Sequence, residues 1–468
     1  MVPTTVAGSF QNDRICEELS IGIPLLMEND SMEPIRRPEC CIYRVPQRLR
    51  QVNEEAYTPK LISIGPFHHD GKQPRDEEND DKDLRDMEKL KLGYLKEFCN
   101  RTMTCPKEIA RIIEENEQKI RSSYSENFDI SREDFVKMVL KDSTFIIELF
   151  LRADKKEKYK NDYLLSNPLL NRHILEDLIL LENQLPFFIL EELHENFSKG
   201  HSENSLFIDL ARNYFYSCIK NIPKEMEKEK GKKKEVKHFT DLIRYFHCPT
   251  KHKDFGDSIR DLSAATQLYE TGVIFKLNEL SGCLLDIQFD KWYPTEICPC
   301  FTCSWLLNCL PCLKCFECLE RTQPLLKMPR FEIDDITEGI FRNIMAWEQC
   351  YYPLEAYLCN YMGLLDYLLN TGEDVELLVE KDIIVDSLGS NEAIAKMVNS
   401  LCLEIVEENS CYTELAQKLN KHFDQCCNHN MGILKSTYFS NLWRGTATVF
   451  GLIIFGFSLW SIIRPYVI

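Results

Sequence analysis

The chain has 468 residues, of which 44% are hydrophobic and 28% are charged, a composition typical of a packed globular protein. Its formal net charge of -18 excludes a general binder of nucleic acids or anionic lipids, because phosphate groups repel such a surface. The 21 cysteines are too unevenly spread, in too long a chain, for a small secreted disulfide scaffold.

The N-terminal residues 1–40 show no regular pattern and contain no apolar core of signal-peptide length. We therefore expect synthesis in the cytosol and reduced thiols. Residues 41–66 combine prolines, tyrosines and a short β-rich run, and they predict an extended entry segment to a body that covers 41–440. Residues 70–83 carry seven acids and three bases, which is typical of a solvated loop.

Apolar residues recur at helical spacing between Ser131 and Arg152, and they place Phe135 and Ile146 on one face of a predicted helix. Asp142 falls on the same apolar side, seven residues after Phe135. A buried acid in such a position is more often a structural hydrogen-bonding group than a catalyst. We therefore predict a structural role for Asp142.

A second helical pattern covers residues 171–193, and it must kink or restart at Pro186, which has no N–H and crowds the preceding turn. Glu182, Asn183 and Gln184 precede this proline and have apolar residues on both sides. We expect their side chains to satisfy the backbone groups that the proline frees, rather than to catalyse a reaction. Residues 224–237 hold seven lysines and four glutamates and predict a mobile linker, with contact to lipid headgroups as the alternative.

Residues 283–289 alternate like a strand, and residues 325–334 are predicted to pair with them in a minor antiparallel β element. The segment between them, 291–324, is a Cys-rich insertion with seven cysteines. Those whose spacing can close on one tetrahedral zinc ion are Cys300, Cys303, Cys309 and Cys312.

The residues between these cysteines are bulky and apolar and include no histidine, which does not favour zinc. Two alternatives therefore stay open, a plain reduced insertion and S-acylation, since acyl chains would hold a loop of an anchored protein at the bilayer surface. The candidates for S-acylation are Cys309, Cys312, Cys315 and Cys318.

The last hydrophobic stretch, 445–463, contains no charge, and as a helix it would span roughly 28 Å, close to the hydrocarbon thickness of a bilayer. Arg444 and Arg464 flank it, and only the short tail 464–468 follows. The alternative is a buried terminal helix, which would keep a polar stripe that this stretch lacks. We expect a single-pass membrane protein with a C-terminal anchor and a cytosolic body, in the plasma membrane or an endomembrane.

The predicted fold is mainly α: a large helical body with a minor antiparallel β element and one C-terminal transmembrane helix. Three stretches, 41–69, 177–193 and 341–350, resemble the signature blocks of a plant family, the domain-of-unknown-function family 247, or uncharacterised protein family 0481. The resemblance covers about residues 40 to 465 and implies a mostly helical membrane protein without an established enzymatic activity. Some grass members are implicated in pollen–stigma self-incompatibility, which implies recognition. No catalytic or cofactor-binding residues carry over, and the Cys-rich insertion departs from the family pattern.

The sequence contains no G-x-S-x-G, phosphate-loop, H-E-x-x-H or dinucleotide motif. His68 and His69 are adjacent, so on a strand they would point to opposite faces and could not share a metal ion. The sequence predicts a non-enzymatic, membrane-tethered interaction protein with an unidentified protein partner and no cofactor. The alternative is an unrecognised membrane-bound hydrolase or zinc-binding protein that uses the Cys-rich segment or the two histidines. Asn100 and Asn196 begin glycosylation triplets, which would be used only if the body faced the lumen.

Overall fold

The computed structural model describes the residues 39–69, 80–197, 205–219, 235–248, 254–279, 281, 283–290, 324–424 and 442–467. The chain divides into two units, Met1–Cys40 and Cys41–Ile468, and the elements below belong to the second. The described residues are mostly helical, so the prediction of a mainly α fold is confirmed. The predicted loop 70–83 lies mostly, and the linker 224–237 and the Cys-rich insertion 291–324 almost entirely, outside the described residues.

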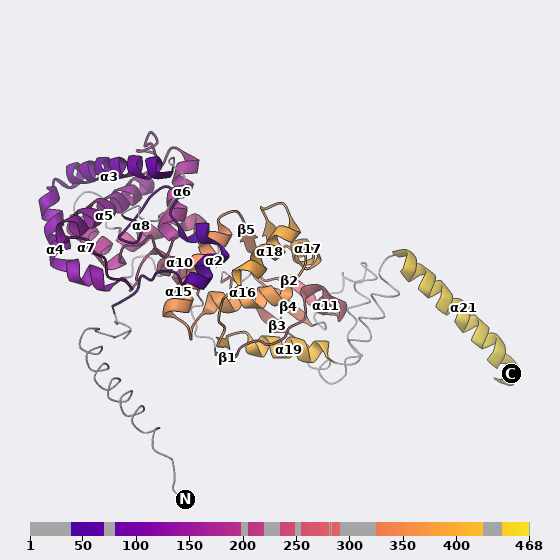
Figure 1. Ribbon diagram of the computed structural model, residues 1–468. Coiled ribbons are helices and arrows are strands. Elements are labelled where there is room, and N and C mark those ends of the chain that lie inside the picture. Colours follow the sequence, from indigo (N-terminus) through magenta and orange to yellow (C-terminus); the bar gives the residue numbers. More distant parts are fainter. Residues whose placement is uncertain are drawn as a thin grey trace, which may run out of the picture. The chain divides into compact units, whose positions relative to one another are not determined.

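The central helix of the first half is α5 (Arg132–Asp154), around which other helices gather (Figure 1). Ser131 caps its N-terminus by accepting a hydrogen bond from the backbone N–H of Asp134 at 3.1 Å. Its side chains are buried nearly all round between Phe135 and Leu151, because neighbours cover more than one face. The helices that pack against it are α3 (Asp80–Thr102), α4 (Pro106–Ser122), α7 (Phe187–Phe197) and α8 (Phe207–Tyr214).

The second half is organised around α15 (Thr337–Tyr351), whose Trp347 is fully buried and stacks on Tyr351 with ring centroids 4.4 Å apart. The helices in contact with α15 are α6 (Pro168–Ile179), α10 (Phe239–His247), α16 (Tyr357–Leu368) and α18 (Asn391–Leu401). The remaining helices are α2 (Gln47–Val52), η1 (Glu54–Tyr57), η2 (Tyr216–Cys218), α11 (Ala265–Glu270), α17 (Gly372–Glu380), α19 (Thr413–Phe423) and α21 (Leu442–Val467).

The strands form three small sheets. β4 (Leu325–Met328) pairs antiparallel with β3 (Gln288–Asp290), so the predicted pairing is present, but its bounds were wrong. Residues 283–287 are not in a strand, and the range 325–334 holds two strands instead of one. The prediction of a purely antiparallel element was incomplete, because β4 also pairs with β2 (Ile274–Leu277). These two strands are parallel, so a tight hairpin cannot join them. The other strands are β5 (Phe331–Ile333) and β6 (Ile384–Asp386), parallel to each other; and β1 (Gly256–Asp257) and β7 (Asn409–Ser410), an antiparallel pair.

The helix predicted over 171–193 is interrupted before Pro186, as expected. α6 ends at Ile179 and α7 begins at Phe187, so the chain restarts its helix directly after the proline. The connecting turn carries Glu182, Asn183 and Gln184, which are all buried. These three polar side chains lie in the interior rather than at the surface, and their partners define the site described below.

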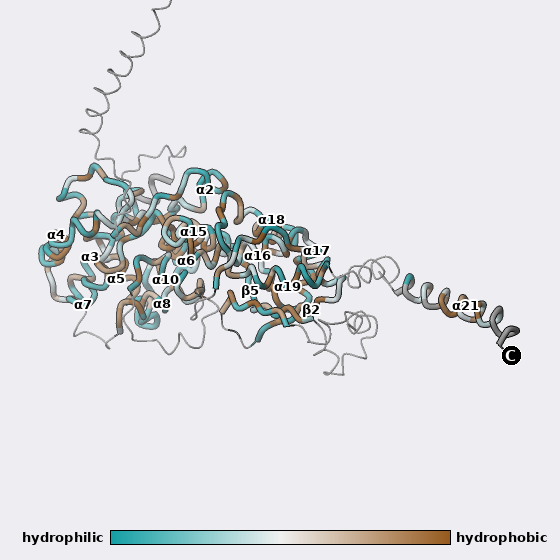
Figure 2. Tube along the Cα trace, turned by 90° about the horizontal axis from the view of Figure 1, so that it is seen from below, coloured by the Kyte–Doolittle hydropathy of each residue, from teal (hydrophilic) through white to brown (hydrophobic). Residues whose placement is uncertain are grey.

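Within the part of the chain that the structure describes, none of the helices combines the length and the apolar composition that a membrane crossing requires. The backbone of α21 is described throughout, but the side chains of some residues in the predicted span 445–463 are not. The longest run of residues whose side chains are described is 450–461. The transmembrane helix therefore stays a prediction. Along this stretch the large apolar side chains are 41–70% exposed. In Figure 2 parts of α21 have the brown colour of hydrophobic residues.

Two glycines with left-handed backbone make a matched pair for a stability test. Gly65 has a φ of 71°, and a Cβ added there would lie 2.6 Å from the carbonyl oxygen of Gln184. Gly389 has a φ of 79°, but a Cβ there would meet nothing within 4 Å. We expect Gly65→Ala to lower the free energy of unfolding by about 2–5 kcal/mol and Gly389→Ala by only about 1–2 kcal/mol. Urea titration checks both, and equal losses would contradict the close contact at Gly65.

Candidate functional site

The entry segment 41–68, here called the strap, is held by the rest of the body. The prediction of an extended segment was only partly right, because α2 and η1 interrupt it. Most of its apolar side chains are buried, with Ile42 and Ile62 completely covered. Among the described residues its strand-like pairing is limited to an isolated parallel bridge between Ile42 and Tyr124. Buried backbone N–H and C=O groups need partners, so most of those in the strap must be satisfied by side chains.

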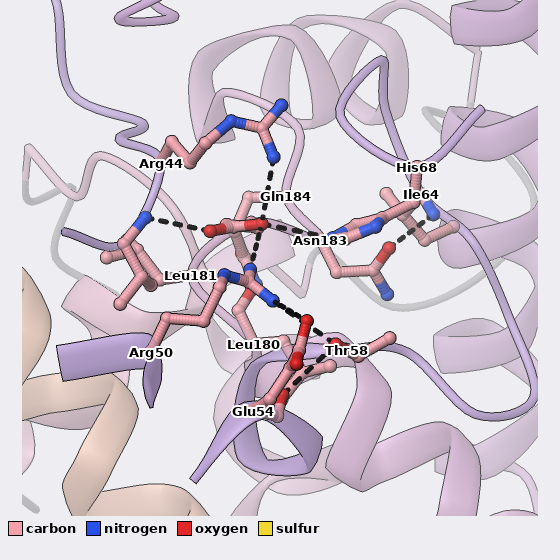
Figure 3. A network of polar contacts seen from close by, with 12 residues as sticks. Arg44, Arg50, Glu54, Thr58, Ile64, His68, Leu180, Leu181, Asn183 and Gln184 are labelled. Atoms are coloured by element: carbon pink, nitrogen blue, oxygen red, sulfur yellow. Dashed lines mark hydrogen bonds and ion pairs between the residues drawn. The ribbon is translucent and has the colours of Figure 1, made fainter. Parts of the chain in front are cut away.

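Glu182 is the first of these side chains, and three basic side chains surround its carboxylate. Figure 3 labels these three, Arg44, Arg50 and His68. Its Oε1 accepts a hydrogen bond from the backbone N–H of Val45 at 2.8 Å. Its Oε2 lies 2.5 Å from Arg50 Nη2, 3.5 Å from Arg44 Nη1 and 3.3 Å from His68 Nε2. Burial alone would raise the pKa of Glu182, but the contacts from His68, Arg50 and Val45 hold it below its usual range. The carboxylate is therefore ionised and committed to the strap.

Asn183 binds the strap through its backbone. Its Oδ1 accepts from the N–H of Ile64 at 2.6 Å, and its Nδ2 donates to the carbonyl of Ile62 at 2.9 Å. The same Nδ2 donates to the carbonyl of Asp177 near the end of α6 at 2.9 Å. One buried amide thus fixes two strap residues against the turn between α6 and α7.

Gln184 serves the helix end, as the sequence predicted. Its Nε2 donates to the carbonyls of Leu178 and Leu180, each at 2.7 Å, where the helix is interrupted. Its Oε1 accepts from the backbone N–H of Phe239 at 3.0 Å, at the start of α10. The sequence predicted that all three side chains would satisfy backbone groups at the helix break. Only Gln184 does so fully, because Glu182 and Asn183 bind mainly to the strap.

Two buried aspartates also bind backbone N–H groups of the strap. Asp177 accepts hydrogen bonds from the consecutive backbone N–H groups of Lys60, Leu61 and Ile62 at 2.9, 2.7 and 2.7 Å. Burial raises its pKa to about 6 despite these three donors. Asp142 accepts from the N–H of Gly65 at 2.9 Å and pairs with the buried Lys91 at 2.7 Å. The surroundings of Asp142 fit the structural role that its position predicted.

Asn343 of α15 connects the third stretch that resembles the family, 341–350, to the other two. Its Nδ2 donates to the carbonyl of Ala56 in the strap at 2.8 Å, and its Oδ1 accepts from the N–H of Leu181 at 2.9 Å. The three stretches that carry the family resemblance therefore meet at one place, which we call the polar hub (Asp142, Asp177, Glu182, Asn183, Gln184 and Asn343 with the strap). The three stretches share one structural role: the first contains the strap, and the other two supply side chains that bind it.

A surface groove of about 190 Å³ adjoins the polar hub, between η1, the end of α6 and the start of α15. Its described lining includes one lysine, Lys60, and no histidine or cysteine. Arg172 pairs with two of the acids, Glu176 at 2.9 Å and Asp335 at 3.2 Å. The carboxylates in the lining are Glu55, Glu176, Asp177, Asp335 and Glu338. Such a lining suits a cationic group and lacks an evident nucleophile paired with a base.

The two histidines singled out by the sequence do not form a metal site in the structure. His68 is buried with its Nε2 toward Glu182, and His69 is half-buried. Neither lines the groove or the smaller cavity beside His247. Across the described ranges no group of three or more His, Cys, Asp or Glu side chains is arranged to hold a metal ion. The zinc and acylation candidates lie outside the described residues and stay predictions: Cys300, Cys303, Cys309, Cys312, Cys315 and Cys318.

The sequence did not reveal Asp177 or Asn343 as members of the site. Both are polar residues on helices whose neighbours one turn away are apolar, the same signal that drew attention to Asp142. That signal indicates burial but not the partner, because the strap lies more than 100 residues away along the chain.

Three buried histidines make the stability of the body depend on pH. Burial lowers the pKa of His194, His238 and His247 to about 4, well below that of an exposed imidazole. The unfolded chain therefore binds protons near pH 6.5 that the folded chain does not, and stability falls as the pH drops from about 6.5 toward 4. Asp177 acts in the opposite sense, because its raised pKa lets the folded state bind a proton first.

Burial also raises the pKa of Asp366 and Glu407, which therefore act in the same sense as Asp177. We expect the free energy of unfolding to fall by about 2 kcal/mol at most between pH 6.5 and 5.5, since these acids offset only part of the loss at the histidines. Urea titrations at pH 7.5, 6.5 and 5.5 measure this change. His238→Gln should make the free energy of unfolding depend less steeply on pH, by the equivalent of up to one bound proton, because it removes one of the three buried imidazoles. A stability that is flat or rises toward pH 5.5 would contradict the burial of these imidazoles.

Comparison with known proteins gives a consistent result. The profile of the family DUF247, described as "Plant protein of unknown function", matches residues 42–457. A UPF0481 protein of Arabidopsis thaliana is 27% identical over 427 residues, which cover 88% of this chain and 83% of that protein. A putative UPF0481 protein of the same plant is 20% identical over 467 residues, 86% of each chain. No solved structure matches.

Proposed function

The chain belongs to DUF247, a family of plant proteins of unknown function, and from that premise we propose that it is a membrane-tethered recognition protein without enzymatic activity. In this proposal α21 lies in a bilayer, the body faces the cytosol, and the acidic groove beside the polar hub receives a basic group of a protein partner. The exposed apolar surface of α21 supports the membrane attachment. The polar hub and the acidic groove support the recognition of a partner.

The surface of α21 is the observation that carries the proposal. Its large apolar side chains from Phe450 to Trp460 are 41–70% exposed, which is a liability in water and suits a lipid environment. Its hydroxyl groups donate to carbonyls one turn earlier: Thr448 to Arg444 at 2.8 Å, and Ser458 to Ile454 at 2.9 Å. A helix in lipid must satisfy its polar groups internally in this way.

The polar hub supports a scaffold rather than a catalyst. Each of its buried acids and amides is bonded to backbone groups or cationic side chains of the same chain, so none is left to act on a substrate. The groove differs in exposure: the carboxylates of Glu55 and Asp335 are 85% and 72% exposed. Lys60 pairs with Glu55 at 3.5 Å and Arg172 pairs with Asp335 at 3.2 Å, both at the surface. Exposed carboxylates around a concave surface favour the approach of a lysine or arginine side chain.

Proximity labelling tests the recognition proposal. The full chain, fused at its N-terminus to a biotin ligase, is compared with the groove variant Glu55→Lys/Asp335→Lys and with Glu404→Lys, a half-exposed acid outside the groove lining. We expect a partner that the wild type and Glu404→Lys recover and that the groove variant loses. Recovery of only those proteins that an unrelated anchored ligase also labels would overturn the proposal.

The orientation of the body has its own test. Asn100 at the end of α3 and Asn196 at the end of α7 are both exposed, so an oligosaccharide transferase in the lumen would find them at the surface. We expect no gel shift on glycosidase treatment of the chain from plant cells. A shift would place the body in the lumen and would overturn both the cytosolic placement and the expectation of reduced thiols.

The state of the Cys-rich insertion is proposed to be plain and reduced, with zinc and S-acylation as the alternatives. Atomic spectroscopy of the purified chain measures bound zinc, and a hydroxylamine-sensitive acyl assay measures thioester-linked lipid. We expect neither signal. Stoichiometric zinc would favour the alternative of a zinc-binding protein, and an acyl signal would show a second contact with the membrane.

A further inference from the structure

A second cavity, of about 30 Å³, lies between η2, α10 and the segment that joins β5 to α15. About half of its described lining is apolar, including Leu284, Phe331 and Phe341. The polar residues of the lining come from different elements: Ser217, His247, Glu332, Asp334 and Thr337. A small cavity either stays dry or holds water, depending on whether its lining has buried polar groups that need a partner.

His247, which lines the cavity, has such a group. The residue is 6% exposed, and its Nε2 lies 3.3 Å from the carbonyl oxygen of Cys218. A carbonyl only accepts hydrogen bonds, so Nε2 carries the proton and Nδ1 is left as an acceptor. Within the described part of the protein Nδ1 has no hydrogen-bond partner. An unsatisfied buried acceptor is rare in native proteins and calls for a donor that is not part of the chain.

We propose that this cavity is a binding site for one ordered water molecule, which donates a hydrogen bond to Nδ1 of His247. Water is the ligand because about 10–15 Å³ suffices for one molecule, whereas an organic ligand needs several hundred. The hydroxyl group of Ser217 in the lining offers a further polar partner for a buried water. The hydroxyl of Thr337 already donates to Asp334 at 2.8 Å, so it could only accept a hydrogen bond from the water. The water would fix the tautomer of His247 with its proton on Nε2 and join α10 to the start of α15.

Nitrogen NMR of the full chain in detergent micelles, with ¹⁵N-labelled histidine, tests this site. We expect His247 to show a protonated Nε2 and an unprotonated Nδ1 whose chemical shift is that of a hydrogen-bonded acceptor, at both pH 7 and pH 6. The signal is assigned by its loss in His247→Gln. A proton on Nδ1, or a Nδ1 shift typical of an acceptor without a donor, would overturn the proposal.

A density map that resolves ordered water makes the test independent of any variant. We expect a peak within hydrogen-bond distance of Nδ1 of His247. An empty cavity at a resolution where other buried waters are seen would overturn the proposal, even if His247→Gln did not fold.

Discussion

Glu182→Ala is expected to lower the free energy of unfolding by about 3–5 kcal/mol, because removing one partner of a buried ion pair leaves the other charge uncompensated. The Arg50 side chain is only 13% exposed and lies 2.5 Å from Glu182, so it would lose its buried counter-charge. The N–H of Val45 would lose its acceptor at the same time. The strap would keep its contacts to Asp177, Asn183 and Asn343 but would lose the buried charge near its start.

Glu126→Ala is the matched control for this prediction. Glu126 forms a bidentate pair with Arg44, at 2.7 and 3.0 Å, but its side chain is 41% exposed. Exposed pairs contribute about 1 kcal/mol or less, so we expect a small loss. Urea titration in detergent measures both variants, and hydrogen exchange at Val45 and Ile64 reports whether the strap opens. Losses of similar size would show that the buried charge at Glu182 does not hold the strap.

Two arginines in the middle of α21 are expected to release the protein from membranes. Ile454 and Phe455 are 64% and 62% exposed, so replacing them leaves the packing of the body unchanged. A charge at the centre of a membrane helix costs about 2.5–3.5 kcal/mol, and two such charges cost about twice as much. We expect Ile454→Arg/Phe455→Arg to move the chain from the membrane fraction to the soluble fraction on fractionation of cells.

The control places one arginine near the end of the same helix. Thr446 lies one turn from the start of α21, where an arginine side chain reaches the headgroup region at little cost. We expect Thr446→Arg to stay with the membranes. If all three chains fractionate alike, the apolar centre of α21 does not determine where the protein lies.

The parts of the fold that follow from local pattern were predictable. Helical spacing identified α5, and the missing N–H of Pro186 indicated the break between α6 and α7. Alternation over 283–289 indicated a strand in this region, but β3 covers only the last two of these residues and Asp290. In each case the cause lies within a few residues of its effect, as a capping group, a proline or a repeat of apolar side chains.

The polar hub was only partly predictable, because its contacts join residues far apart in sequence. The buried positions of Glu182 and Asn183 could be inferred from their apolar neighbours, but their main partner, the strap, has no periodicity that would reveal it. The parallel pairing of β2 with β4 was missed for the same reason. Long-range pairing of backbone groups with single side chains leaves no local pattern in a sequence.

The central claim is that α21 lies in a bilayer, and flotation of the intact chain tests it most directly. Membranes from cells that express the full-length protein are washed at alkaline pH without detergent and then centrifuged through a density gradient. The account predicts that the chain rises with the lipid. Finding the intact chain in the high-speed supernatant, with no lipid attached, would contradict it.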